Sequence, residues 1–166
     1  MVKFQRGGAA LDPFEWPERV AIADLFQALG YQFAGVSMAL GLEFRQQLPG
    51  AALHVLFDRE SLADVISSLV HNAFSVCERG GEVRLSAQAL DGRCVIRVAD
   101  TGPGIAAGDR ERIFARDFAR RGRESFSLNL YQLRQVVESA QGRVRAENLP
   151  GGGACFTITL PLARPA

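Results

Sequence analysis

The stretch DTGPGI at Asp100–Ile105 decides how the rest of the sequence is interpreted. It follows an alternating run, Val95–Val98, so an acid stands where a strand ends and the chain turns. Glycine lets the backbone approach a flat ligand because no Cβ intervenes, and proline stiffens the turn. A buried carboxylate needs a donor, and the exocyclic amine of adenine is one. An ordinary Asp-Gly loop has the same residues, so the flanking segments must decide.

A helix that carries an asparagine precedes this stretch. Its apolar residues fall three and four apart and predict one buried stripe, formed by Leu62, Val65, Ile66, Leu69 and Val70. Asp58 stands where the N-cap of that helix is expected. Asn72 lies near the other end, and its amide oxygen is a neutral ligand suited to Mg²⁺ that phosphates already hold.

These segments resemble the ATP-binding catalytic domain of bacterial sensor histidine kinases, in the GHKL superfamily that also holds DNA gyrase and MutL. Four pieces match in family order: the helix with Asn72-Ala73, the loop Asp100–Gly104, the lid residue Phe114 and the last strand Phe156–Pro161. The resemblance covers roughly residues 15 to 162. It implies that the chain binds ATP and Mg²⁺ as cofactors.

The resemblance assigns a role to each residue of the first glycine box. Asp100 would accept a hydrogen bond from the adenine amine, and Thr101 would hold a bridging water. Gly102 and Gly104 would let the loop close on the base, with Ile105 beside it. On the preceding helix, Asn72 would be the catalytic residue and the ligand that joins Mg²⁺ to the phosphates.

The segment from about Ala106 to Ser125 matches the mobile lid of the family, and Phe114 is its aromatic residue. The arginines Arg116, Arg120, Arg121 and Arg123 cluster in this segment. Arginine forks suit a γ-phosphate, and we expect Arg116 and Arg120 to contact it. A solvated basic loop is the alternative interpretation of the same cluster.

The sequence departs from the family at the phosphate end of the expected site. Ser68 stands where the family has an asparagine and where gyrase-like members have a glutamate that acts as general base, so a fast hydrolase is disfavoured. Ser75 replaces the expected phosphate-binding lysine, and Val76 replaces the aromatic residue that usually follows it.

The second glycine box is also altered. The family reads G-T-G-L-G-L before its last helix, whereas Ser127 and Asn129 replace the glycines on either side of Leu128 here. Those glycines let bare N–H groups meet phosphate at a helix N-terminus, so phosphate approach should be more crowded. Serine and asparagine still cap helices, so the last helix should form near residues 127–130. Ala154 replaces a small hydroxyl residue before the final strand.

Composition indicates one globular domain at residues 18–166 that follows a linker or tail at 1–17. The net charge of +1 argues against a nucleic-acid binder. The three cysteines, Cys77, Cys94 and Cys155, lack a C-x-x-C spacing and are expected to be free thiols.

The long apolar run at 20–42 contains Asp24, so it predicts an amphipathic core helix and no membrane span. His54 is expected to be a strand side chain; His71 either packs or touches nucleotide.

The predicted fold is an α/β two-layer sandwich, with about five mostly antiparallel strands packed on three helices. A hairpin is expected over Asp91-Gly92. The expected strands lie at 42–45, 53–57, 82–89, 94–99, 143–147 and 155–160. This is also the fold that the resemblance implies.

Two functions remain open. The first is a cytoplasmic histidine kinase catalytic domain that transfers the ATP γ-phosphoryl to a histidine on a separate dimerisation domain, which then passes it to a response regulator. No H-E-[LI]-R-x-P motif occurs, so the acceptor would lie in another domain, and the chain could be the cytoplasmic part of a larger membrane-bound sensor. The second is a degenerate regulatory or docking module with weak or no ATP binding. A serine kinase of the anti-sigma class shares the fold and is a third, weaker alternative.

Overall fold

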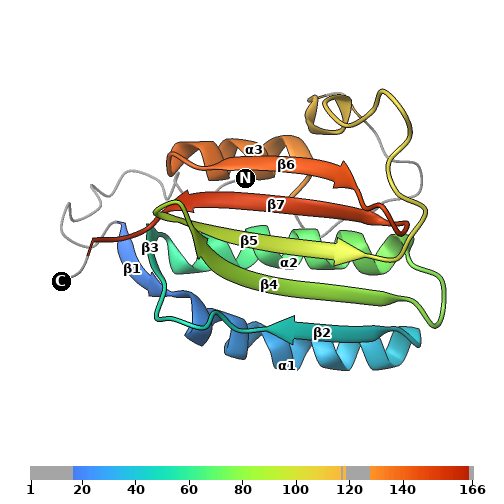
Figure 1. The fold of residues 1–166 in the computed structure, drawn as a ribbon, viewed down its shortest axis with the longest axis horizontal. Helices are drawn as coiled ribbons and strands as arrows, with labels where there is room; N and C mark the ends of the chain where they lie inside the picture. Colours follow the sequence, from blue (N-terminus) through green and yellow to red (C-terminus); the bar gives the residue numbers. More distant parts are fainter. Residues whose placement is uncertain (1–16, 117, 119–127, 165–166) are drawn as a thin grey trace, which may run out of the picture.

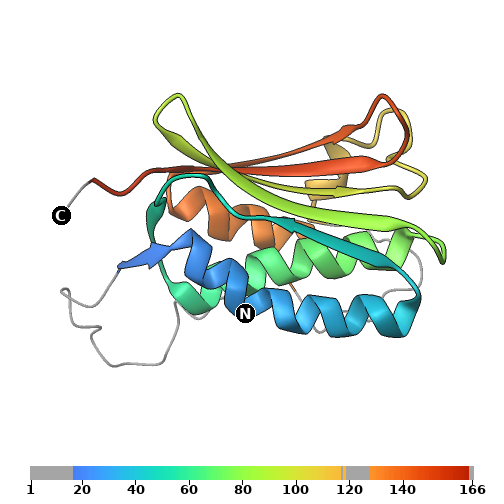
Figure 2. The same cartoon turned by 60° about the horizontal axis from the view of Figure 1, so that its bottom comes forward.

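The computed structural model describes residues 17–116, 118 and 128–164, and it has two layers. Three helices lie on one face of a mixed sheet, and no described helix covers the other face (Figures 1 and 2). The elements are β1 (Glu18–Ala21), α1 (Ile22–Leu40), β2 (Glu43–Gln47), β3 (His54–Phe57), α2 (Arg59–Val76), β4 (Glu82–Leu90), β5 (Arg93–Asp100), a short 3₁₀-helix (Arg112–Phe114), α3 (Leu130–Ser139), β6 (Arg143–Asn148) and β7 (Ala154–Pro161). The predicted two-layer fold is confirmed; the linker predicted for 1–17 lies almost wholly outside the described residues.

The described sheet has five strands in the order β2-β4-β5-β7-β6. Every neighbouring pair is antiparallel except β2 with β4, which are parallel and are joined by a long connection that contains β3 and α2. The predicted hairpin joins β4 to β5, and both turn residues have positive φ, 51° at Asp91 and 73° at Gly92. Those values fit the two-residue turn that matches the twist of the strands.

A separate two-stranded ribbon differs from the prediction. The strand expected at 53–57 does form, as β3, but it pairs antiparallel with β1 and does not join the main sheet. β1 is only four residues long and runs directly into α1, where the N–H of Ile22 donates to the carbonyl of Leu53 at 3.0 Å. A strand that short carries too little alternation to be separated from the helix that follows it.

The helices form where the pattern predicts. Asp58 caps α2, since its carboxylate accepts hydrogen bonds from the N–H of Ser61 at 3.0 Å and from the Ser61 hydroxyl at 2.6 Å. The predicted apolar stripe of α2 is fully buried against the sheet, with zero exposure at Leu62, Val65, Ile66, Leu69 and Val70. Gly41 ends α1 in the left-handed conformation with φ of 68°. None of the described helices has the length and hydropathy to cross a membrane.

His71 belongs to the core and not to the candidate site. Its ring makes edge-to-face contacts with Phe33 on α1 at 6.0 Å and with Phe74 at 6.2 Å, between centroids. Phe44 on β2 contacts both phenylalanines, so four rings fasten α1, α2 and β2 together. This location supports the packing interpretation of His71.

The burial of His71 predicts a pH dependence of stability. Burial lowers the pKa of the imidazole from its usual 6.5, so the unfolded chain binds this proton more readily than the folded chain. The free energy of unfolding should therefore fall as pH drops from 6.5 towards the lowered folded pKa. We expect His71→Phe to remove part of that fall in urea denaturation series from about pH 8 to about pH 5.5. Parallel profiles for the two proteins would contradict the assignment.

Candidate functional site

The Asp100 carboxylate closes β5 and is 4% exposed. Its Oδ1 accepts two backbone hydrogen bonds, from the N–H of Gly102 at 2.8 Å and from the N–H of Ala154 at 3.3 Å. No described residue donates to Oδ2. Every fully buried side-chain nitrogen or oxygen in the described structure has a partner, so Oδ2 is not sealed in the interior. The backbone thus fixes one carboxylate oxygen, and the other has no donor among the described residues.

Glycines make the approach to this carboxylate possible. A Cβ on Gly102 would lie 3.0 Å from Asp100 Oδ1 and 3.0 Å from the carbonyl oxygen of Val76. Gly153, with φ of +88°, passes so close that a Cβ would lie 1.8 Å from the carbonyl oxygen of Asp100. The turn between β6 and β7 is therefore pressed directly against the end of β5.

Asn148, at the end of β6, holds the loop that follows Asp100. Its Oδ1 accepts from the N–H of Ile105 at 2.7 Å, and its amide nitrogen donates to the carbonyl oxygen of Ile105 at 2.9 Å. A Cβ on Gly104 would lie 2.7 Å from Asn148 Oδ1, and its φ of +80° also favours glycine. The Asn148 amide therefore bonds both backbone groups of Ile105, as a paired strand would, and fixes the Gly104-Ile105 backbone.

Thr101 fixes the same loop from the opposite edge. Its Oγ1 accepts from the N–H of Glu82 at 2.9 Å, and its own N–H donates to the carbonyl oxygen of Glu82 at 3.1 Å. Burial raises the pKa of the Cys77 and Cys155 thiols, and the nearby Asp100 charge acts in the same direction. Both thiols therefore stay neutral beside the carboxylate.

One face of α2 spans the distance between the Asp100 loop and the start of α3. Ser68, Asn72 and Val76 are four residues apart, so they lie in one row along the helix. At one end of the row Val76 packs on Gly102, and at the other end Ser68 Oγ accepts from the N–H of Leu128 at 3.1 Å. Asn72 lies between them, about 6 Å along the axis from each. This places the predicted metal ligand between the base end and the phosphate end of the site.

Backbone donors at the phosphate end have partners within the protein. Asn129 caps α3 in a two-way capping box: its side chain accepts from the N–H of Gln132 at 2.8 Å, and its own N–H donates to Gln132 Oε1 at 3.2 Å. With the Leu128 N–H taken by Ser68, two consecutive amides are satisfied internally. The prediction that Asn129 still caps the helix is confirmed.

Two lid residues of the prediction are described. Phe114 is 4% exposed and packs edge-to-face on Phe156 of β7, with centroids 6.3 Å apart. The guanidinium of Arg116 lies 6.0 Å from the centre of the Tyr131 ring, so it reaches the start of α3. Arg120, Arg121, Arg123 and Ser127 lie outside the described residues. Within the described ranges no three His, Cys, Asp or Glu side chains form a metal cage.

The sequence interpretation missed two residues of this site. Asn148 stands before Leu149-Pro150 and resembles a plain turn residue, and its partner Ile105 is 43 positions away. Gly153 stands in a run of three glycines, and only its contact with Asp100 distinguishes it from Gly152. A change from alternation to Pro and Gly at the end of β6 was the only local signal for either residue.

Comparison with known sequences identifies the group to which this arrangement is related. Residues 57–164 match the family described as histidine kinase-, DNA gyrase B- and HSP90-like ATPase. The adaptive-response sensory kinase SasA of Crocosphaera subtropica is 35% identical over 132 residues, which are 77% of this chain and 34% of that protein. The histidine-protein kinase BaeS of Escherichia coli is 27% identical over 87% of this chain and 32% of that protein. The chain thus spans about a third of the length of these relatives.

Solved structures show the same fold. The nucleotide-free catalytic domain of histidine kinase ThkA superposes with a TM-score of 0.79 at 21% identity, over 87% of this chain and 94% of that one. Full-length ShkA in complex with AMPPNP gives 0.78 at 28% identity, over 90% of this chain and 32% of that one. ThkA in complex with the response regulator TrrA gives 0.74 at 22% identity, over 88% of this chain and 42% of that one.

Gly152 and Gly153 form a matched pair for a stability test. Both have positive φ, but a Cβ on Gly152 would meet nothing within 4 Å. Gly152→Ala should lower the free energy of unfolding by about 1–2 kcal/mol from backbone strain alone. Gly153→Ala should lower it by at least about 2 kcal/mol more, because the Asp100 carbonyl must move. Urea denaturation measures both, and equal losses would contradict the close approach.

Asn148→Ala should loosen the Gly104-Ile105 backbone. The two hydrogen bonds to Ile105 are lost, and about 1–3 kcal/mol of stability with them. Hydrogen exchange of the Ile105 amide should accelerate, whereas it should stay unchanged in Glu147→Ala, an exposed neighbour. Undiminished protection of the Ile105 amide in Asn148→Ala would show that Asn148 does not hold the loop.

Proposed function

Because this chain belongs to the histidine kinase-, DNA gyrase B- and HSP90-like ATPase family, we propose that it binds Mg²⁺·ATP and presents the γ-phosphoryl group to a histidine of a separate dimerisation domain. The resemblance expected from the sequence is confirmed by that match. The observation that supports nucleotide binding most directly is the divided Asp100 carboxylate. One oxygen is fixed by Gly102 and Ala154, and the other is left for a donor.

The residues present fit a purine with an exocyclic amine. Adenine would donate this amine to Asp100 Oδ2, and Gly102 would let the ring lie against the loop without a Cβ in the way. Ile105, 7% exposed, would offer an apolar contact to the base. A hydrogen bond to a buried carboxylate contributes more than one to a neutral acceptor, so this contact would select adenine.

Phosphoryl transfer would depend on positioning. Mg²⁺, held by Asn72 and the phosphates, would neutralise charge on the triphosphate. The imidazole nitrogen of the partner domain would attack the γ-phosphorus, the bond to the β–γ bridging oxygen would break, and ADP would leave. Ser68 gives its hydroxyl proton to the carbonyl oxygen of Asp64 at 2.6 Å and cannot act as a base for water, which agrees with transfer over hydrolysis.

We propose a response regulator as the downstream partner and the cytoplasm as the location. The structure of ThkA with TrrA supports the first, since that histidine kinase of the same fold forms such a complex. Arg116, whose guanidinium lies beside Tyr131 of α3, would contact the γ-phosphate together with Arg120 if this function is correct.

A specific observation favours a second function, a degenerate regulatory or docking module. The N–H groups of Leu128 and Asn129, at the position of the second glycine box, are bonded to Ser68 and Gln132. Phosphate would have to displace those partners. The lysine expected at residue 75 is a serine whose hydroxyl donates to the carbonyl oxygen of Asn72 at 2.7 Å. Adenine recognition would remain, and triphosphate binding would be weak.

Thermal denaturation separates the two functions. At fifty times its Kd, Mg²⁺·ATP should stabilise the protein by about 2 kcal/mol, which corresponds to a rise in Tm of about 5 °C. Asp100→Asn should abolish the rise. The asparagine oxygen would keep the two backbone N–H bonds, and its NH₂ group would then face the adenine amine.

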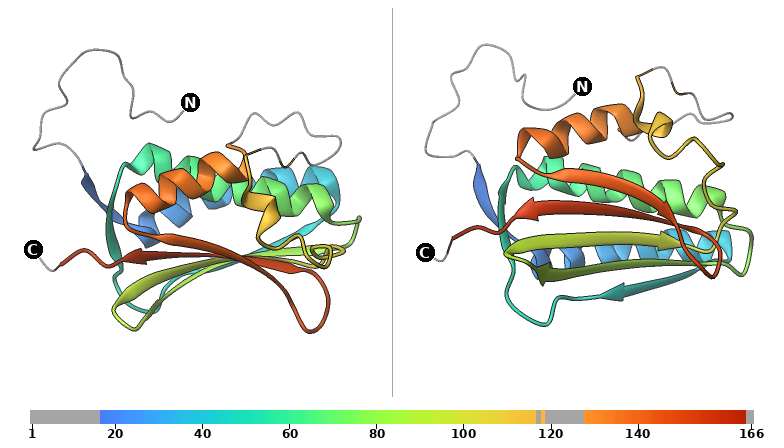
Figure 3. Two further views of the ribbon diagram at one scale, coloured as in Figure 1. Left: turned by 90° about the horizontal axis from the view of Figure 1, so that it is seen from above. Right: turned by 45° about the horizontal axis from the view of Figure 1, so that its top comes forward.

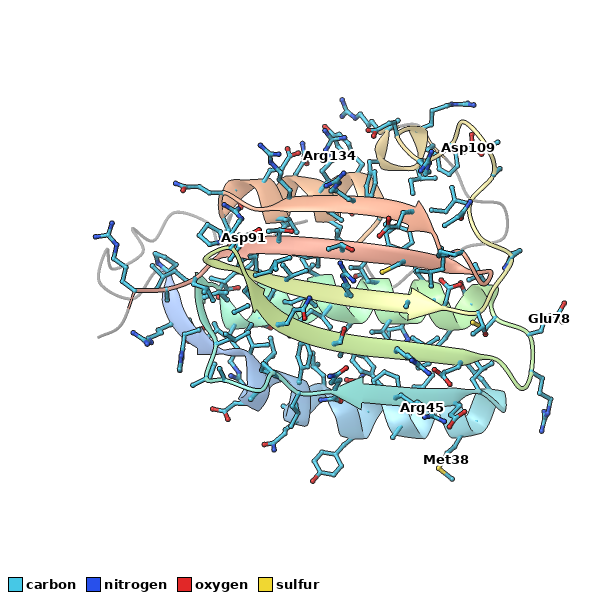
Figure 4. The ribbon with its side chains drawn as sticks, in the orientation of Figure 1. Met38, Arg45, Glu78, Asp91, Asp109 and Arg134 are labelled. Atoms are coloured by element: carbon cyan, nitrogen blue, oxygen red, sulfur yellow. The ribbon has the colours of Figure 1, made fainter. Side chains whose placement is uncertain are left out.

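Asp91→Asn is the matched control, because the same chemical change is made at the hairpin between β4 and β5, at the far end of the sheet (Figure 4). It should keep the full rise in Tm. No rise for the unchanged protein at about 10 mM Mg²⁺·ATP would remove the kinase proposal and leave the docking module.

A further inference from the structure

The sheet face opposite the helices carries an uneven distribution of arginines. No described helix covers this face, which Figure 3 shows edge-on and Figure 4 shows from the front. Its β2–β4 side is neutralised: Arg45 pairs with Glu43 at 2.8 Å and with Glu82 at 3.3 Å, and Arg84 pairs with Glu82. The charged side chains on that side are therefore paired with one another within the protein.

The β5–β7–β6 side is different. Arg97, Arg143 and Arg145 are exposed, and none of them has an ion pair or hydrogen bond to a described residue. We call these three residues the open arginine patch. One acid, Glu147, lies on the same strand as Arg145, two residues further on. The patch therefore keeps a net positive charge that no described residue neutralises by an ion pair.

The strand register sets the spacing of the patch. Thr157 of β7 pairs with Arg97 of β5 on one side and with Arg145 of β6 on the other. Arg143 pairs with Thr159 in the next row. Neighbouring strands are about 4.8 Å apart, so the backbones of Arg97 and Arg145 are about 10 Å apart with a hydroxyl between them. Like charges held at this spacing disfavour folding slightly, so the patch adds nothing to the stability of the fold.

We propose that the open arginine patch is a docking surface for an acidic segment of a partner protein. Guanidinium forks bind carboxylates with two parallel hydrogen bonds. A chain in the polyproline II conformation has three residues per turn and rises about 3.1 Å per residue, so carboxylates three residues apart lie on one side of it, about 9 Å apart, close to the spacing of Arg97 and Arg145. Thr157 would offer its hydroxyl to the backbone that crosses between them.

The chemistry of the face favours a protein partner over other anions. No aromatic residue lies on the described strands' open face, so bases of a nucleic acid would have nothing on which to stack. A membrane-binding face needs exposed apolar side chains in addition to charge. The described residues of β5, β7 and β6 include no exposed large apolar side chain, and the exposed Leu90 lies outside these strands, at the end of β4. Asp100 points into the helical side of the sheet, so a partner on this face would leave the nucleotide site open. The proposal is independent of ATP binding.

Fluorescence anisotropy with the full chain and a fluorescein-labelled octaglutamate peptide tests the proposal, at about 150 mM salt, where charges beyond about 8 Å are screened. The unchanged protein should bind this peptide and not octaglutamine. Arg97→Gln/Arg145→Gln should raise Kd about tenfold, because two charged contacts are lost. Arg45→Gln/Arg84→Gln makes the same change in net charge on the same face and should raise Kd less than about threefold.

Three results would overturn the proposal. The first is no binding of octaglutamate at about 1 mM protein, where even a Kd in the millimolar range gives a signal. The second is an equal loss in the two double variants, which would show that net charge alone matters. The third is tighter binding to oligothymidylate or to phosphatidylserine vesicles than to octaglutamate, which would assign the patch to nucleic acid or membrane.

Discussion

The structure depends on one buried carboxylate, whose first oxygen accepts two backbone hydrogen bonds and whose second oxygen has no donor among the described residues. Asp100 Oδ1 accepts from Gly102 in its own loop and from Ala154 in the neighbouring strand, so it fixes where β5 ends and where β7 begins. Gly153 must pass against the Asp100 carbonyl for Ala154 to reach that oxygen. The same acid therefore closes the sheet and presents Oδ2. Structural and recognition roles cannot be separated at this residue.

The two ends of the candidate site are built in different ways. At the base end, Asn148 and Thr101 hold the loop from both sides and leave the acid open. At the opposite end, Ser68 and the Asn129–Gln132 capping box bind the amides that would otherwise meet phosphate. Two departures from the family pattern, Ser68 and Asn129, thus have a structural role here, because their side chains bond the backbone at the start of α3. The proposed adenine end thus keeps an acid without a second described donor, whereas the backbone amides at the proposed phosphate end are bonded within the protein.

Sequence patterns predicted those parts of the fold that depend on residues close together in the chain. The α2 stripe, the Asp58 cap and the Asp91-Gly92 turn depend on residues within a few positions of each other, and all three are confirmed. The β1–β3 ribbon and the Asn148 clamp depend on partners far apart in the chain, and no local period reveals them. Ala21 pairs with His54, 33 positions away, and Asn148 bonds Ile105, 43 positions away. For the site, motif spacing predicted candidate roles for Asp100 and Asn72, whereas the contacts that position Asp100 come from distant parts of the chain and required the structure.

Calorimetric titration of the protein with ATP and with inosine triphosphate, both with excess Mg²⁺, tests the central claim most directly. The two nucleotides have the same triphosphate and ribose and differ at the purine 6-position, where ATP has an amine and inosine triphosphate a carbonyl oxygen. If Asp100 Oδ2 recognises the amine, ATP should bind at least about tenfold more tightly, since a hydrogen bond to a charged group contributes about 1.5–3 kcal/mol. Equal affinities for the two nucleotides would contradict the account, because recognition would then not pass through this carboxylate.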